Sequence, residues 1–141
     1  MQLPNRFDRY AFLSVTAVTM GLLLYGCGES KVSQCNKVVT VANKTKTLAV
    51  PKDVTGFVSL AENIDQIRIE VQAVAVQDSK LKELQVQLLG MYGDVSQALK
   101  AKAKATEAKD KNALDKAKQD LETSVGKEND IVDRLNALCT K

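Results

Sequence analysis

Side chains able to do chemistry are few in this sequence, and they form no recognisable active-site pattern. None of the 141 residues is histidine, so neither a conventional nucleophile-base triad nor an imidazole metal site can be built. Ser96 and Lys100 have a serine-lysine spacing that a lysine-rich helix produces by chance, and Glu62 and Asp65 are expected to be surface neighbours on a helix. We therefore expect no enzyme, no catalytic residue, no metal site, no cofactor and no small-molecule substrate.

The most informative reactive group is the thiol of Cys27, because an apolar stretch over residues 11–24 precedes it. Arg6 and Arg9 lie before that stretch, and a small residue, Gly26, stands directly before the cysteine. A basic start, an apolar middle and a small residue at the end are the three parts of a secretory signal. The stretch is shorter than the roughly 20 residues of a membrane span, which favours a removed signal over a permanent anchor. An uncleaved anchor and an ordinary buried cysteine are the alternatives.

Leu24, Gly26 and Cys27 resemble the cleavage motif of bacterial lipoproteins, which places Leu three residues before an invariant Cys and Gly or Ala just before it. Tyr25 departs from the small residue usual at its position. The resemblance implies that residues 1–26 are removed and that Cys27 carries lipid on its sulfur and on its nitrogen. Two or more acyl chains anchor a protein stably to a membrane.

The same resemblance implies a domain plan and a compartment. Residues 27–30 would be the lipidated cysteine and a short tether, and residues 31–141 would form the mature domain at the cell envelope, facing the periplasm or the exterior. Asp after the lipid cysteine marks inner-membrane retention in proteobacterial members, so Gly28 favours the outer membrane. The mature segment Ser33-Gln34-Cys35-Asn36-Lys37 also resembles small helical lipoproteins of cyanobacteria, and no known activity accompanies that likeness.

Cys35 and Cys139 remain as a pair once Cys27 is acylated. An exported chain meets an oxidising compartment, where an even number of cysteines tends to pair. We expect a Cys35–Cys139 disulfide that closes almost the whole domain, with two free buried thiols as the alternative.

Apolar residues at alternating three- and four-residue spacing predict a coiled-coil seam from Phe57 to Val95. Only Asp78 and Gln85 interrupt it, so the seam is expected to be open near its middle. The pattern stays in phase across Gly90-Met91-Tyr92-Gly93. It therefore predicts one long helix over about residues 53–105, kinked rather than broken at the two glycines.

Two shorter helices are predicted on either side, over about residues 31–49, ended by Pro51, and over about residues 109–140. Short connections make neighbouring helices antiparallel, so both fold back on the long helix and meet head to tail along it. The predicted fold is all-α: an elongated antiparallel helical hairpin or three-helix coiled coil. Helix overlap, a second copy or a partner protein would cover four apolar residues off the seam, which are Ile69, Val76, Val86 and Met91.

A lysine-rich segment lies at the expected tip of the hairpin. Residues 100–118 hold seven lysines against three carboxylates, a local charge of +4. The simplest interpretation is a solvated helix end, and the alternative is contact with anionic lipid headgroups or wall polymer. Nucleic acid is not an expected partner, since an exported chain lacking aromatic side chains for base stacking does not suit it. The residues that would touch an anionic surface are Lys100, Lys102, Lys104, Lys109 and Lys111.

These features favour a lipid-anchored envelope protein with a structural or protein-interaction role. Its partners would be the membrane, through the lipid, and an envelope protein or a second copy. The alternative function is a helical periplasmic binding module or chaperone for apolar clients or ligands, which needs an accessible apolar groove.

Overall fold

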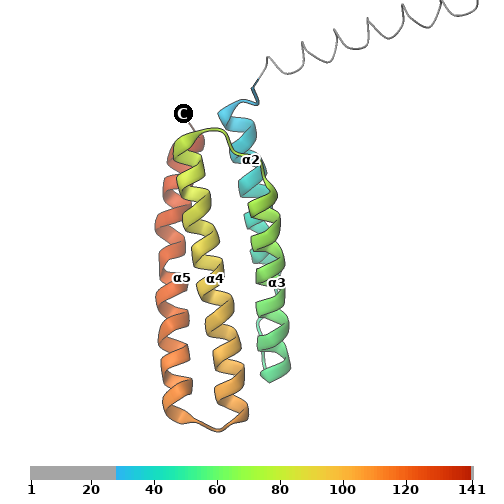
Figure 1. The fold of residues 1–141 in the computed structure, drawn as a ribbon, viewed down its shortest axis with the longest axis vertical. Coiled ribbons are helices and arrows are strands. Elements are labelled where there is room, and N and C mark those ends of the chain that lie inside the picture. Colours follow the sequence, from blue (N-terminus) through green and yellow to red (C-terminus); the bar gives the residue numbers. More distant parts are fainter. Residues whose placement is uncertain (1–27, 141) are drawn as a thin grey trace, which may run out of the picture. The chain divides into compact units, whose positions relative to one another are not determined.

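The computed structural model describes residues 28–140, and the chain divides into two units, Met1–Ser30 and Lys31–Lys141. The second unit is a helical bundle (Figure 1). Residues 28–30, the described part of the first unit, are not helical. The expected signal segment over residues 1–26 and the expected lipid site at Cys27 lie outside the described residues.

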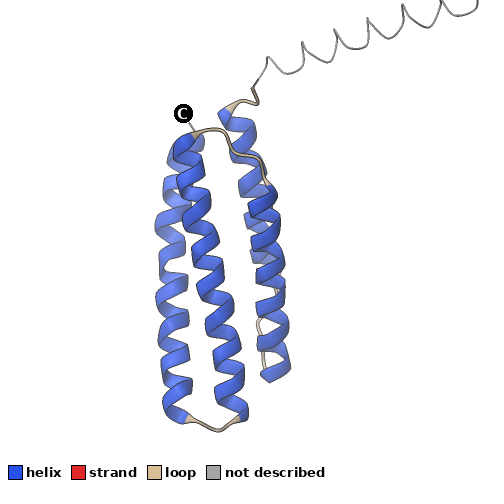
Figure 2. Cartoon of the chain, in the orientation of Figure 1, coloured by secondary structure: helices blue, strands red, loops and turns tan. Residues whose placement is uncertain are grey.

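The described part of the bundle contains helices and loops but no strand (Figure 2). The predicted all-α, antiparallel helical class is therefore confirmed, although the number of helices differs from the prediction. The elements in chain order are α2 (Lys31–Ala42), the 3-10 helix η2 (Asn43–Thr47), α3 (Val54–Ala73), α4 (Ser79–Glu107) and α5 (Lys111–Cys139).

The single long helix predicted over residues 53–105 is wrong, because the chain turns between α3 and α4. Val74 adopts an extended conformation after the last turn of α3. Asp78 then caps α4 by accepting a hydrogen bond from the backbone N–H of Leu81 at 2.9 Å, which satisfies one of the free donors at a helix start. The apolar pattern missed this turn because Val74 and Leu81 are seven residues apart, so the heptad phase continues across it.

The glycines expected to kink the helix are accommodated inside α4 instead. Gly90 is exposed and an added Cβ would meet nothing within 4 Å, whereas Gly93 lies beneath the Arg68 guanidinium. The neighbouring Met91 and Tyr92 are buried at 4% and 3% exposure. Burial of two large side chains outweighs the cost of up to about 1 kcal/mol that each glycine adds to a helix.

The first helix is also shorter than predicted, since α2 ends at Ala42 rather than near residue 49. The hydroxyl of Thr45 donates to the Ala42 carbonyl at 2.9 Å, and that of Thr47 donates to the Lys44 carbonyl at 2.8 Å. Such local bonds compete with continuation of an α-helix. The chain tightens into η2 and becomes extended at Leu48.

The turn at 74–78 changes the topology. Because it makes α3 and α4 antiparallel neighbours, α2 packs against α3 and α5 instead of meeting the last helix head to tail along one rod. The helices α4 and α5 run side by side and extend past the first residues of α3 (Figure 1). A turn with Lys109 at φ 54 joins them, and Asp110 caps α5 by accepting from the N–H of Ala113 at 3.0 Å.

The core lies between the facing sides of the helices. Its largest share comes from α4, with α3 next and α2 and α5 adding fewer residues. Of the four off-seam apolar residues, Met91 is buried and Val76 is half-buried, so helix packing covers them. Ile69 and Val86 remain 55% and 58% exposed. The representative core residues are Cys35, Val38, Ile64, Val71, Leu81, Leu88, Tyr92, Leu99, Ile131 and Leu135.

Candidate functional site

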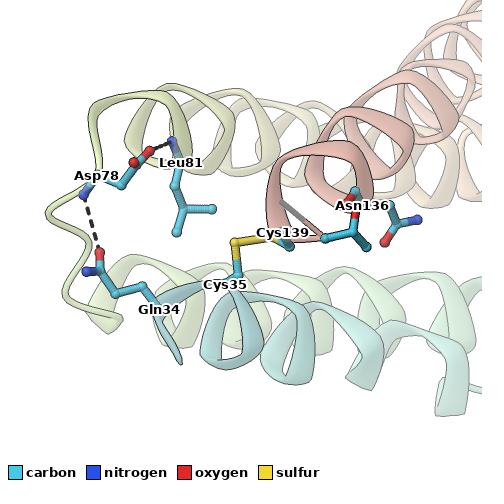
Figure 3. The surroundings of a disulfide bond; sticks show 7 residues. Gln34, Cys35, Asp78, Leu81, Asn136 and Cys139 are labelled. Carbon is cyan, nitrogen blue, oxygen red and sulfur yellow. Dashed lines mark hydrogen bonds between the residues drawn. A yellow bond between two sulfur atoms is a disulfide. The ribbon is translucent and has the colours of Figure 1, made fainter. Parts of the chain in front are cut away.

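The first candidate region is the disulfide end of the bundle (Figure 3). Cys35 near the start of α2 is bonded to Cys139 at the end of α5, with Cα atoms 5.7 Å apart and a sequence separation of 104. That distance lies within the usual range for a disulfide. Cys35 is fully buried, so the thiol pair expected from the sequence is a structural cross-link rather than a reactive site.

The residue next to Cys35 ties the same end of α2 to the loop before α4. The Gln34 side-chain oxygen accepts a hydrogen bond from the backbone N–H of Gln77 at 2.6 Å. It also accepts one from the backbone N–H of Asp78 at 3.3 Å (Figure 3). Gln34 is 3% exposed. Two consecutive residues of α2 therefore bind two other elements: Gln34 binds the loop that leads into α4, and Cys35 binds the end of α5.

Gln85 accounts for the polar position in the middle of the apolar seam. It is 1% exposed, and its amide nitrogen donates to the carbonyls of Val71 at 2.7 Å and Val74 at 3.0 Å. These carbonyls belong to the end of α3, where helical carbonyls lack intrahelical partners. The Gln85 side-chain oxygen has no hydrogen-bond partner within the described residues. The seam is thus closed at this position, not open as expected.

Lys100, the first of the five lysines expected to contact an anionic surface, forms an ion pair within the bundle. Lys100 lies 2.6 Å from Asp65 of α3. Burial would raise the pKa of Asp65, but hydrogen bonds from Lys100 and Ser96 and the charges of Lys100 and Arg68 outweigh it and lower that pKa. Lys100 is therefore engaged within the bundle.

The other four lysines of that set differ from Lys100. Lys104, Lys109 and Lys111 are exposed, and Lys102 is partly buried with its ammonium 4.3 Å from the Phe57 ring centroid, a cation-π contact. Within residues 28–140, none of the four forms an ion pair. The α4–α5 tip carries uncompensated positive charge as a result.

An apolar groove lies beside Lys102, and the sequence analysis did not locate it. The groove has a volume of about 410 Å³, within the range of about 300–1,000 Å³ typical of small-ligand sites. Its most buried lining residues, Val95 and Leu99 of α4, form its floor, and α3, α5, η2 and the extended segment after η2 supply the rest of the lining. The lining residues are Thr45, Leu48, Ala49, Val50, Pro51, Phe57, Leu60, Ile64, Val95, Leu99, Lys102, Leu121 and Val125.

The early end of α2 creates this groove. Because α2 stops at Ala42, the space between α3 and α5 is filled by a helix only near the disulfide end. Beyond it, an extended segment containing Leu48 and Val50 lines the same space, and Val50 is 84% exposed. The sequence signal for this arrangement was the run Asn43 to Thr47, whose hydroxyls end the helix.

Tyr92 marks the boundary between the filled and the open parts of that space. Its hydroxyl donates a long, 3.5 Å hydrogen bond to the carbonyl of Ala42, the last residue of α2. Burial, together with the negative charge of Glu128, raises the pKa of Tyr92 to about 12, and a hydrogen bond with Thr45 opposes that rise. Tyr92 is therefore un-ionised at neutral pH. Its buried ring packs in the core next to the end of α2.

Other hollows on the bundle are lined by charged groups. One contains Asp94, Asp120 and Lys127, and another contains Asp78, Glu83 and Arg134. Over residues 28–140 there is no cluster of His, Cys, Asp or Glu able to hold a metal ion. In the same part of the chain, none of the helices has the length and apolar character needed to cross a membrane.

Comparison with known proteins adds no relative: no protein family, no curated protein and no solved structure matches this chain.

Proposed function

We propose that this protein is a lipid-anchored component of the bacterial cell envelope with a structural or protein-interaction role and no catalytic activity. The observation that carries the proposal is the Cys35–Cys139 bond, which joins the two ends of the domain. Disulfides of this kind persist in exported proteins and are rare in a reducing cytosol. The bond therefore agrees with the compartment inferred from the motif ending at Cys27.

The anchor would hold the bundle close to its membrane. Residues 28–30 separate Cys27 from α2, and three residues span at most about 10 Å when extended. The disulfide lies at the start of α2, so the end of the bundle nearest the tether is the cross-linked one. Gly28 favours the outer membrane in a host that has one.

Metabolic labelling with an alkyne analogue of palmitate tests the anchor in a bacterial host. The full chain should take up label and sediment with membranes, whereas Cys27→Ser should be unlabelled and released. Cys139→Ser is the matched control, because it also removes one thiol yet should stay labelled. Equal labelling of the Cys27→Ser variant and the wild type would refute the anchor.

A second candidate function is a binding module for apolar clients or ligands, and the groove beside Lys102 favours it. Most of the groove lining is aliphatic or aromatic, and two of its apolar residues, Val50 and Val125, are 84% and 46% exposed. Sites of this composition bind ligands mainly by burial of apolar surface. An apolar-site dye that gains fluorescence with the wild type, but not after Val125→Phe, would support this role.

A further inference from the structure

In the groove beside Lys102, a non-helical segment stands where a continued α2 would have supplied a further helix. A packed helix needs about 8–10 Å between its axis and those of its neighbours. Here the non-helical segment containing Leu48 and Val50 lines the groove together with Leu121 of α5. What remains is the space between an extended chain and a helix, which suits a ligand thinner than a helix.

The groove is also short and has one distinctly apolar floor. Val95 and Leu99 of α4, the most buried lining residues at 6% and 2% exposure, form that floor, and Lys102 follows Leu99 by three residues on the same helix. The seven steps of the helix from Val95 to Lys102 advance about 10 Å. A single unbranched hydrocarbon chain fits such a channel, whereas the second chain of a diacyl lipid would stay in water.

The positive charge of Lys102 indicates the polar part of the ligand. The Lys102 ammonium lies over the Phe57 ring, which lines the groove, and forms no ion pair within residues 28–140. Lys104, on the same helix, likewise lacks an ion pair there, and the tip beyond it carries further unpaired lysines. An anionic headgroup placed at Lys102 would gain a charge-assisted hydrogen bond.

We infer that the groove binds one fatty-acid anion, with its hydrocarbon chain on Val95 and Leu99 and its carboxylate at Lys102. The inference rests on the second candidate function and names its ligand class. It does not depend on acylation of Cys27, so the two proposals can fail separately.

Photo-crosslinking to the full chain in phosphatidylcholine nanodiscs tests the site. The probe is a fatty acid with a diazirine in mid-chain, and the matched probe is the alcohol of equal length. Crosslinks should fall in the peptides that carry Val95 to Leu99, Leu121 to Val125 and Leu48 to Pro51. Crosslinks spread evenly over all helices would overturn the proposal.

Two pairs of variants separate the hydrocarbon contact from the charge contact. Val125 is 46% exposed and lines the groove, so Val125→Phe should fill it and abolish labelling, while Val132→Phe, 40% exposed on the same helix outside the groove, should not. The second pair tests the charge contact. Lys102→Met should reduce labelling by the acid probe about tenfold and leave labelling by the alcohol probe unchanged. Lys104→Met should leave labelling by both probes unchanged. Equal losses for acid and alcohol in Lys102→Met would refute the anionic ligand while leaving an apolar binding site in place.

A competition series on the unmutated chain covers the case in which a variant does not fold. Unlabelled fatty acids from about four to about sixteen carbons should at first displace the probe about fourfold better per methylene. The gain should cease once the chain fills the groove. An increase that continues unchanged through the longest acid would indicate partition into the bilayer, and would overturn the site.

Discussion

Cys35 and Cys139 lie with their Cα atoms 5.7 Å apart and bond α2 to α5, although they are 104 positions apart in the chain. A cross-link over so long a loop restricts the unfolded chain strongly, by up to about 4.7 kcal/mol on the chain-entropy model. Because α2 is only 12 residues long, the bond supplies much of what keeps this helix docked.

Reduction of the disulfide should therefore lower the free energy of unfolding by about 2–4 kcal/mol. Urea unfolding followed by circular dichroism, with and without reductant, measures this change. Cys139→Ser should resemble the reduced wild type and should not respond to reductant. Unfolding midpoints that are identical with and without reductant in the wild type would contradict the structural role of the bond.

The buried amide of Gln85 should stabilise the turn between α3 and α4. Gln85→Met keeps the size of the side chain but removes the N–H donor of the Val71 and Val74 carbonyls, and Val71 then keeps only the backbone N–H of Val74. We expect a loss of about 1–3 kcal/mol in the free energy of unfolding. Gln97→Met, at an exposed position of the same helix, should stay within about 0.5 kcal/mol of wild type, and an equal effect of the two changes would argue against the capping role.

Gly90 tests whether α4 is continuous. Its added Cβ would meet nothing within 4 Å, and Ala is favoured over Gly inside a helix by about 0.5–1 kcal/mol. Gly90→Ala should therefore raise the unfolding free energy by that amount, as measured by urea denaturation. Gly126→Ala, at an equally open position of α5, is the reference. Destabilisation by Gly90→Ala alone would indicate a break in α4.

The Asp65–Lys100 pair should make a pH-dependent contribution to the free energy of unfolding. Because the pKa of Asp65 is lowered in the folded state, its stabilising effect is present above the unfolded value of about 3.9 and is lost as pH falls through the folded value. Asp65→Asn should cost up to about 1 kcal/mol near pH 7. Asp115→Asn, at a more exposed i,i+3 pair with Lys118, should cost less. A cost for Asp65→Asn that persisted unchanged into strong acid would be inconsistent with this ion pair.

Tyr92 should ionise at a higher pH than an ordinary tyrosine. Its pKa of about 12 in the folded protein exceeds the ordinary value of 10.0, so its contribution to stability is complete below pH 10 and is lost as pH rises toward 12. Phenolate absorbance near 295 nm, taken as the difference between wild type and Tyr92→Phe, isolates this residue from the other tyrosines. A midpoint near 10 in folded protein would show that the hydroxyl at the end of α2 is solvated.

The all-α class and the cysteine pair were predictable, because both depend on features that the sequence shows directly: apolar spacing and an even thiol count. The turn at 74–78 was not found, since Val74 and Leu81 keep the heptad phase on either side of it. Asp78 and Gln85, the two polar interruptions, carried the missing information: the first caps α4 and the second satisfies the end of α3. Polar residues in an otherwise apolar seam marked a chain reversal here.

The groove could not be predicted, because it depends on where α2 ends and on which elements line the space beyond. The hydroxyls of Thr45 and Thr47 end the helix through bonds to nearby carbonyls, and the resulting gap appears only once α3, α4 and α5 are assembled. Lys102 looked like one of many surface lysines in the sequence. Its position over Phe57 distinguishes it.

The mass of the intact protein extracted from membranes of a bacterial host tests the central claim most directly. The account predicts the mass of residues 27–141 plus the acyl groups on Cys27, less the two hydrogens lost when Cys35 and Cys139 pair. Reduction should add those hydrogens back without removing the lipid. A species with the unmodified mass of all 141 residues and free thiols would contradict the account.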